Sequence, residues 1–110
     1  VGCAAMAEDG RVFLGANVEH CLNYSDHAEK VAILCGLMAG ARRFPIIVVA
    51  STRALFTPCG NCMDKIMQYG GHDCEIFYYN VNTKETKRFT AKELMPYYPT
   101  RDRAAKPQKE

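Results

Sequence analysis

No apolar run in this 110-residue chain approaches the length that a membrane span needs, and no signal-peptide pattern opens it. The chain also lacks a large charge excess, because its formal net charge is only +2. That value gives no strong electrostatic argument for nucleic-acid binding. Neither an internal repeat nor an interdomain linker divides the sequence. These absences predict one small domain that binds no membrane.

Six cysteines are many for a chain of this length and would suit a secreted protein held by disulfides. However, Cys3, Cys21 and Cys35 lie in apolar or turn-like sequence, where a reduced cysteine behaves as a small hydrophobic residue. The regular alternation of strand and helix patterns also indicates a core that needs no disulfides. We therefore expect a reduced, cytoplasmic protein.

The apolar residues alternate between the periods of strands and helices. The pattern predicts strands at 2–7, 11–18, 46–50, 75–80 and 86–89, helices at 28–38, at 58–69 and briefly after Thr90, and a polar loop at 19–25. We expect Asp26 to cap the first helix, and Thr90 with Glu93 to form a capping box. This order predicts an α/β fold with one mixed central sheet flanked by helices. Residues 1–99 would form this domain, and the charged segment 100–110 is predicted to be disordered.

Two short segments carry the residue types of a metal centre. His27 in His-Ala-Glu, and Cys59 and Cys62 in Pro-Cys-Gly-Asn-Cys, offer one imidazole and two thiolates. All three lie at predicted helix N-termini, where the helix dipole favours the thiolate. A zinc ion with three protein ligands keeps its fourth position for water, which is the catalytic arrangement. Glu29 is not needed as a ligand and can move a proton between that water and a substrate.

Each part of this pattern has a simpler interpretation when it is taken alone. The Cys59–Cys62 pair could be a redox pair or half of a structural zinc site. Glu29 could be a capping-box residue that answers Asp26, and a single histidine is usually an ordinary polar residue. The combination of both spacings at two predicted helix starts favours a catalytic zinc. A zinc ion that only holds the fold together is the non-enzymatic alternative.

The same segments resemble a known family. His27-Ala28-Glu29 and Pro58-Cys59-Gly60-Asn61-Cys62, together with stretches at 1–5, 8–13, 15–20 and 93–96, are similar to the zinc-dependent cytidine deaminases and the related blasticidin-S deaminases. The resemblance runs from Val1 to about Tyr98. It implies a three-layer α/β/α sandwich with a mixed central sheet and one zinc ion per chain. The implied activity is hydrolysis of cytidine or deoxycytidine to uridine or deoxyuridine with release of ammonia, a reaction of pyrimidine salvage. It also implies a homodimer or homotetramer with active sites at subunit interfaces.

The resemblance also assigns substrate-binding residues. In the family, the Asn and Glu of an Asn-Val-Glu element hold the ribose 3′-hydroxyl, and these correspond to Asn17 and Glu19. Ala28 in the zinc motif and Tyr24, in place of a loop tyrosine, complete the expected set. A site that holds a free 3′-hydroxyl would exclude a polynucleotide, whose 3′ oxygen is esterified. A nucleoside is therefore the expected partner, and nucleic acid is not.

Three features depart from the family pattern. The loop at 20–24 reads His-Cys-Leu-Asn-Tyr, which favours as an alternative a modified nucleoside or a nucleoside antibiotic such as blasticidin S. His27 and Lys30 stand where many members have Cys and Arg, and a site with one thiolate fewer has less need of the arginine. The family's N-terminal helix, with an aromatic that packs on the base, is not in this sequence. Either the chain is a truncated piece, or its pocket is closed differently, by a partner subunit or by Tyr97 and Tyr98. A cytosine deaminase for single-stranded DNA or RNA is a third alternative.

Overall fold

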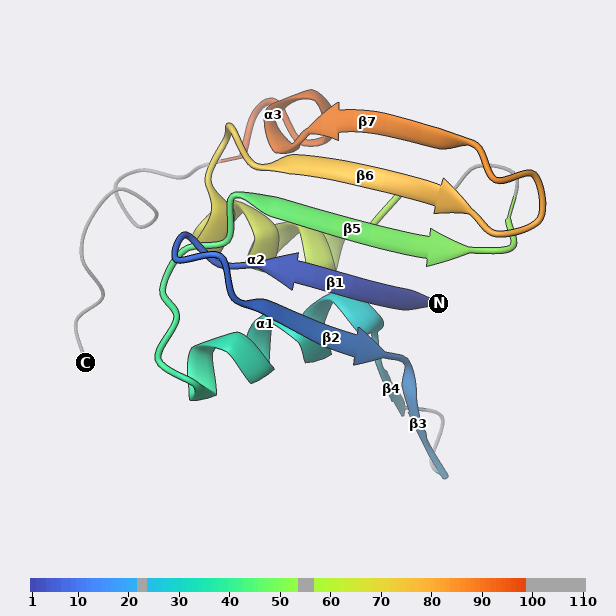
Figure 1. Cartoon of the computed structure of the whole chain (residues 1–110), viewed down its shortest axis with the longest axis horizontal. Coiled ribbons are helices and arrows are strands. Elements are labelled where there is room, and N and C mark those ends of the chain that lie inside the picture. Colours follow the sequence, from blue (N-terminus) through green and yellow to red (C-terminus); the bar gives the residue numbers. More distant parts are fainter. Residues whose placement is uncertain (22–23, 54–56, 99–110) are drawn as a thin grey trace.

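A five-stranded mixed sheet forms the centre of the computed structural model, which describes residues 1–21, 24–53 and 57–98 (Figure 1). The strand order is β2-β1-β5-β6-β7. The central pair, β5 and β6, is parallel, and its neighbours on both sides are antiparallel. The strands are β1 (Gly2–Met6), β2 (Val12–Ala16), β5 (Ile46–Ser51), β6 (Glu75–Asn80) and β7 (Thr86–Thr90).

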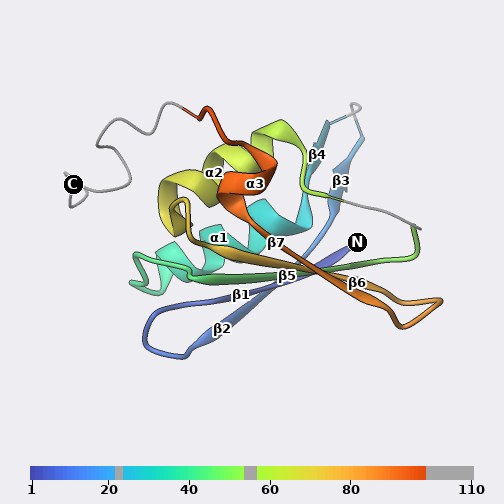
Figure 2. The ribbon, with the colours of Figure 1, turned by 90° about the horizontal axis from the view of Figure 1, so that it is seen from above.

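The helices cover one face of this sheet. α1 (Ala28–Met38) and α2 (Gly60–Gly70) pack against it, and α3 (Ala91–Leu94) lies beside α2 (Figure 2). Alternate residues of β1, β5 and β6 are buried under the helices, and the residues between them are half-buried. The predicted α/β fold with a mixed sheet is confirmed. Within the described ranges no helix covers the opposite face, so the third layer of the predicted sandwich stays a prediction.

A second, two-stranded antiparallel sheet lies where the sequence predicts a polar loop. β3 (Val18–His20) and β4 (Tyr24–Asp26) pair with each other, which satisfies their backbone groups. The prediction of a loop at 19–25 is therefore wrong. All three residues of β3 are exposed, so the segment shows no alternation of apolar and polar residues. Periodicity finds a strand only where one of its faces is buried.

The predicted limits of α1 agree with the structure, but the predicted cap does not. Asp26 is not the N-cap residue. Its carboxylate accepts from Lys30 Nζ at 2.8 Å and lies 3.1 Å from His20 Nε2. The N-cap residue is His27, in an extended conformation. The Oδ1 atom of Asn17 instead accepts from the backbone N–H of Ala28 at 2.9 Å. A side chain from the end of β2 thus takes over the role that was expected of Asp26.

α2 also begins slightly later than predicted. Its first helical residue is Gly60 rather than Pro58, and Cys59 is the N-cap. The capping box of α3 is confirmed, because Thr90 and Glu93 each accept a hydrogen bond from the other's backbone N–H. The segment 100–110 lies outside the described residues, so its predicted disorder stays a prediction.

Gly15 on β2 sets how closely the first turn of α1 approaches the sheet. A Cβ atom at Gly15 would lie 2.3 Å from the carbonyl oxygen of Ala28 and 2.6 Å from the backbone nitrogen of Ala32. Both are backbone atoms, which cannot move aside as a flexible side chain can. The absence of a side chain at Gly15 therefore fixes the position of the helix end that carries His27. No described helix is long and apolar enough to cross a bilayer.

Candidate metal centre and active site

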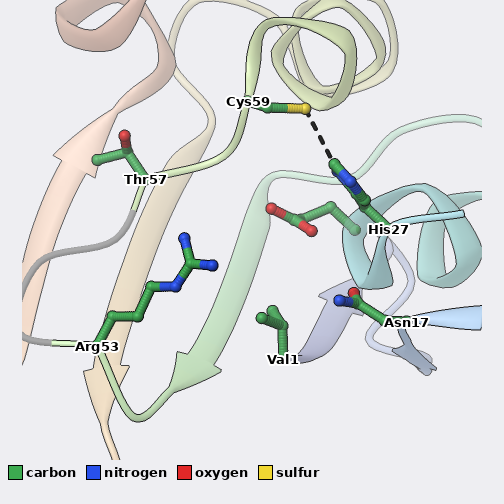
Figure 3. A pocket seen from close by; sticks show the side chains of 7 residues that line it. Val1, Asn17, His27, Arg53, Thr57 and Cys59 are labelled. Atoms are coloured by element: carbon green, nitrogen blue, oxygen red, sulfur yellow. Dashed lines mark hydrogen bonds between the residues drawn. The ribbon is translucent and has the colours of Figure 1, made fainter. Parts of the chain in front are cut away.

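The N-termini of α1 and α2 bring the three predicted ligands together. His27 and Cys59 are the N-cap residues of these helices, and Cys62 lies in the first turn of α2. Their ligand atoms all lie within 4.8 Å of one another. The Nδ1 atom of His27 is 3.3 Å from Cys59 Sγ, the contact drawn in Figure 3, and 3.5 Å from Cys62 Sγ.

These distances fit a tetrahedral zinc ion. Typical bond lengths of about 2.3 Å to sulfur and about 2.0–2.1 Å to nitrogen place the two ligand atoms roughly 3.6 Å apart across a tetrahedral angle. The distances from His27 Nδ1 to the two sulfur atoms lie close to that value. One imidazole and two thiolates also suit zinc chemically. His27, Cys59 and Cys62 could therefore hold the ion with little rearrangement.

The expected lowering of thiol pKa values at the helix N-termini does not hold for Cys62. Its side chain is buried, and this burial, followed by the nearby charge of Glu29, raises the pKa of Cys62 to about 12. Burial disfavours the thiolate more strongly than the helix dipole favours it. Zinc binding must then displace a proton from Cys62, because the thiolate is the form that ligates a metal.

Glu29 has the environment that the predicted proton-transfer role needs. Its side chain is only 1% exposed, yet it lines the same cavity as His27 and Cys59. Among the described residues, neither of its carboxylate oxygens has a hydrogen-bond partner. A buried polar group without partners destabilises a fold, so its presence calls for a functional reason. In this position both oxygens can interact with a molecule that enters the cavity.

The cavity has a volume of about 350 Å³, within the range of small-molecule sites. It lies beyond the carboxyl end of β5, the usual place for a ligand in a sheet of this kind. Seven described residues line it: Val1, Asn17, His27, Glu29, Arg53, Thr57 and Cys59 (Figure 3). Sequence reasoning missed Val1, Arg53 and Thr57. The available signal for Arg53 was its position just after a buried strand.

The four predicted substrate-binding residues lie in different surroundings. Asn17 lines the cavity. Ala28 is fully buried, and its backbone N–H is already bonded to Asn17. Glu19 is exposed on β3 and is not among the described lining residues. Tyr24 belongs to β4, and its side chain lies outside the described part of the structure. Their roles toward a substrate stay predictions.

The C-terminal tyrosines do not close the cavity in this chain. Tyr97 is 94% exposed, and the hydroxyl of Tyr98 donates to Asp64 on α2. Neither tyrosine is among the described residues that line the cavity. The alternative in which Tyr97 and Tyr98 of the same chain close the pocket therefore does not hold.

The six cysteines are all free thiols. Cys74 is buried and donates to the backbone oxygen of Phe44 at 3.2 Å, which agrees with the predicted packing role. Burial raises the pKa of Cys74 to about 12, so this thiol stays protonated. Cys21 and Cys35 are exposed, and neither belongs to the group around His27.

Comparisons with known proteins agree with the site. Residues 1–79 match the model of the cytidine and deoxycytidylate deaminase zinc-binding region. A cytidine deaminase of Sporosarcina psychrophila is 30% identical over 98 residues, which are 87% of this chain and 71% of the relative. One from Mycobacterium tuberculosis (strain ATCC 25618 / H37Rv) is 32% identical over 78 residues, which are 69% of this chain and 59% of the relative.

A solved structure supports the same conclusion. The crystal structure of a cytidine deaminase from Burkholderia pseudomallei superposes with a TM-score of 0.78 at 28% identity, covering 87% of this chain and 78% of that one. Fold and ligand set thus define a zinc-binding α/β domain of the deaminase class. The chain belongs to the cytidine and deoxycytidylate deaminase family. The predictions of this family, of zinc as cofactor and of a zinc-dependent hydrolase are confirmed.

Proposed function

We propose that this protein hydrolytically deaminates a cytidine-like nucleoside, converting cytidine or deoxycytidine to the uridine product and ammonia. One observation carries the proposal: the unpartnered, buried carboxylate of Glu29 shares a cavity with the ligand group of His27, Cys59 and Cys62. A site that only stabilised the fold would not need this carboxylate. The relatives and the solved structure described above are all cytidine deaminases.

The residues divide the work as follows. His27, Cys59 and Cys62 would hold the zinc ion through one nitrogen and two sulfur atoms. A bound zinc ion would supply an activated water, with a pKa near 7, as the nucleophile for the amidine-like carbon of the base. Glu29 would take one proton of this water and pass it to the ring nitrogen, and would then carry the second proton from the new hydroxyl group to the departing amine, which leaves as ammonia. Proton transfer of this kind contributes roughly 10² to 10⁴ in rate.

Asn17 supports a nucleoside as the substrate. Its Oδ1 atom is engaged by the N–H of Ala28, so its side chain is held in one orientation at the wall of the cavity. The Nδ2 group can then donate to a ribose hydroxyl. The expected partner in this interaction, Glu19, lies on the adjoining β3 strand. It would have to reach the ribose from the rim.

The outer face of α1 supports a homodimer or homotetramer. Leu34 is 43% exposed, Met38 is 89% exposed, and Cys35 between them is also exposed. These side chains follow helical spacing, so α1 is apolar on its outer face as well as on the face against the sheet. Helices that are apolar all round are normally buried. We propose that a second copy of the chain covers this face.

The free thiols support a reducing compartment. Cys21 and Cys35 are exposed and unpaired, a state that persists in the cytoplasm rather than outside the cell. We therefore place the enzyme in the cytoplasm and its reaction in pyrimidine salvage.

An assay with a substrate panel tests the proposal. Zinc-loaded protein is incubated with cytidine, deoxycytidine, blasticidin S and a single-stranded oligonucleotide, and ammonia release and absorbance are followed. We expect turnover of the two nucleosides and about one zinc ion per chain by metal analysis. Activity on blasticidin S or the oligonucleotide without activity on nucleosides would contradict the proposal. Light scattering should give two or four chains per particle, and a monomer would refute the role of the α1 face.

A further inference from the structure

Three buried polar side chains hold the backbone of one exposed residue, Arg53. The Tyr78 hydroxyl and the Asn80 Nδ2 group both donate to the Arg53 carbonyl oxygen, the latter at 2.9 Å. The Ser51 hydroxyl accepts from the Arg53 N–H at 3.1 Å. Ser51, Tyr78 and Asn80 are 7%, 2% and 5% exposed. They come from the ends of β5 and β6, so the central parallel pair of the sheet fixes Arg53.

This anchoring directs the Arg53 side chain. Figure 3 shows its guanidinium pointing into the cavity, with Thr57 on the same side and Asn17 across from it. Burying a polar side chain costs folding free energy, because the side chain loses its contact with water. Three such buried side chains around one loop residue are therefore unusual. Supporting hydrogen bonds of this type are how a protein keeps a functional side chain in one place.

Deamination itself does not require this cation. His27 and Cys59 of the ligand group lie across the cavity from Arg53, and cytosine and ribose are both neutral (Figure 3). Among the described residues that line the cavity, Arg53 is the only arginine or lysine. A guanidinium presents its donors in a planar fork that matches two oxygens of a phosphate. The Thr57 hydroxyl can add one further donor.

We propose that Arg53 is a specificity-determining residue that binds the phosphate of a nucleoside monophosphate. The inference rests on the proposed deaminase function and narrows its substrate class: the base occupies the zinc end of the cavity, and the phosphate lies at the Arg53 end. A phosphate monoester carries about −1.5 to −2 charges at pH 7, so it gains more from one arginine than a neutral hydroxyl does. Cytidine would then be a poorer substrate than its monophosphate.

The test compares kcat/KM for cytidine and cytidine monophosphate in four proteins. These are the unmodified enzyme, Arg53→Met, Arg53→Lys and the control Lys87→Met, which removes one positive charge from an exposed position of β7 that does not line the cavity. We expect Arg53→Met to lower kcat/KM for the monophosphate by about 10- to 100-fold, the range of a charge-assisted hydrogen bond. The value for cytidine should stay within about twofold. Arg53→Lys should recover part of the loss, and Lys87→Met should change neither value.

The outcomes separate this inference from the proposed function. Equal use of cytidine and its monophosphate, or an equal loss on both in Arg53→Met, overturns the role of Arg53 and leaves the deaminase proposal intact. No turnover of either compound overturns the deaminase proposal. In that case calorimetric binding of the same two compounds to the same four proteins decides the role of Arg53. Arg53-dependent binding of a single-stranded oligonucleotide without binding of the monophosphate also overturns the inference.

Discussion

Replacing Glu29 should raise the stability of the fold and lower the deaminase activity. Its carboxylate is 1% exposed, and neither oxygen has a partner among the described residues. A buried polar group left without hydrogen bonds costs about 1–3 kcal/mol of folding free energy. Glu29→Leu removes that cost at similar side-chain volume, so the free energy of unfolding should rise by about 1–3 kcal/mol. In a domain of this size each kcal/mol raises Tm by about 4–8 °C.

The same position should be needed for turnover. Glu29→Gln keeps the shape but cannot transfer the proton, so the rate should fall by roughly 10² to 10⁴, or about 3–5 kcal/mol of transition-state stabilisation. Thermal unfolding is followed by circular dichroism in chelator, and deamination is measured with zinc. Glu93→Leu is the control, because that carboxylate is exposed and bonded to Thr90, and its loss should lower Tm. A lower Tm for Glu29→Leu, or an active Glu29→Gln, would refute the reasoning.

Three further predictions concern the packing of α1, the cap of α3 and the pH dependence of zinc binding. Gly15→Ala places a Cβ 2.3 Å from the backbone oxygen of Ala28, so it should lower stability by at least about 1–3 kcal/mol in urea denaturation and weaken zinc binding; unchanged values would contradict the close approach. Thr90→Ala removes the N-cap side chain of α3 and should lower the free energy of unfolding by about 1 kcal/mol. Because the cap lowers the pKa of Glu93, the parent and Thr90→Ala should differ most in free energy of unfolding above pH 4.5, the usual pKa of the group. The difference should shrink in more acidic solution, and a difference that did not change with pH would argue against the cap. Zinc affinity should rise at least about tenfold per pH unit between pH 6 and 8, since Cys62 alone must lose one proton, and chelator competition showing no pH dependence would contradict this.

The parts of the site that the sequence predicts are those set by local spacing. The limits of α1 follow from apolar residues three and four apart, and they agree with the structure at both ends. The ligand group follows from two motifs at helix starts, each of which needs only its own helix to position it. His27 in an extended N-cap conformation explains how Glu29, two residues later, lines the same cavity. A regular helix would have turned the two side chains apart.

The missed parts depend on contacts between distant segments. The Asn17 bond to Ala28 joins residues eleven apart in the sequence, so no local rule for helix caps could place it ahead of Asp26. Arg53 is positioned by Tyr78 and Asn80, which are 25 and 27 residues away. Their approach requires the parallel register of β5 and β6. Neither interaction can be predicted before the strand order is known.

The two helix N-termini share a feature that predicts how zinc and stability are linked. His27 and Cys59 are N-cap residues, yet neither side chain caps its helix, because both point toward the ligand group. His27→Asn supplies a good capping side chain and removes a zinc ligand, so the metal-free variant should be about 1 kcal/mol more stable than the metal-free parent. Zinc at 100 times its dissociation constant should stabilise the parent by about 2.7 kcal/mol, and the variant much less. The order of the two Tm values should therefore reverse when zinc is added. If the variant were less stable in both states, the histidine would be stabilising the fold without metal, and zinc binding could not explain why the N-cap residue of α1 is a histidine.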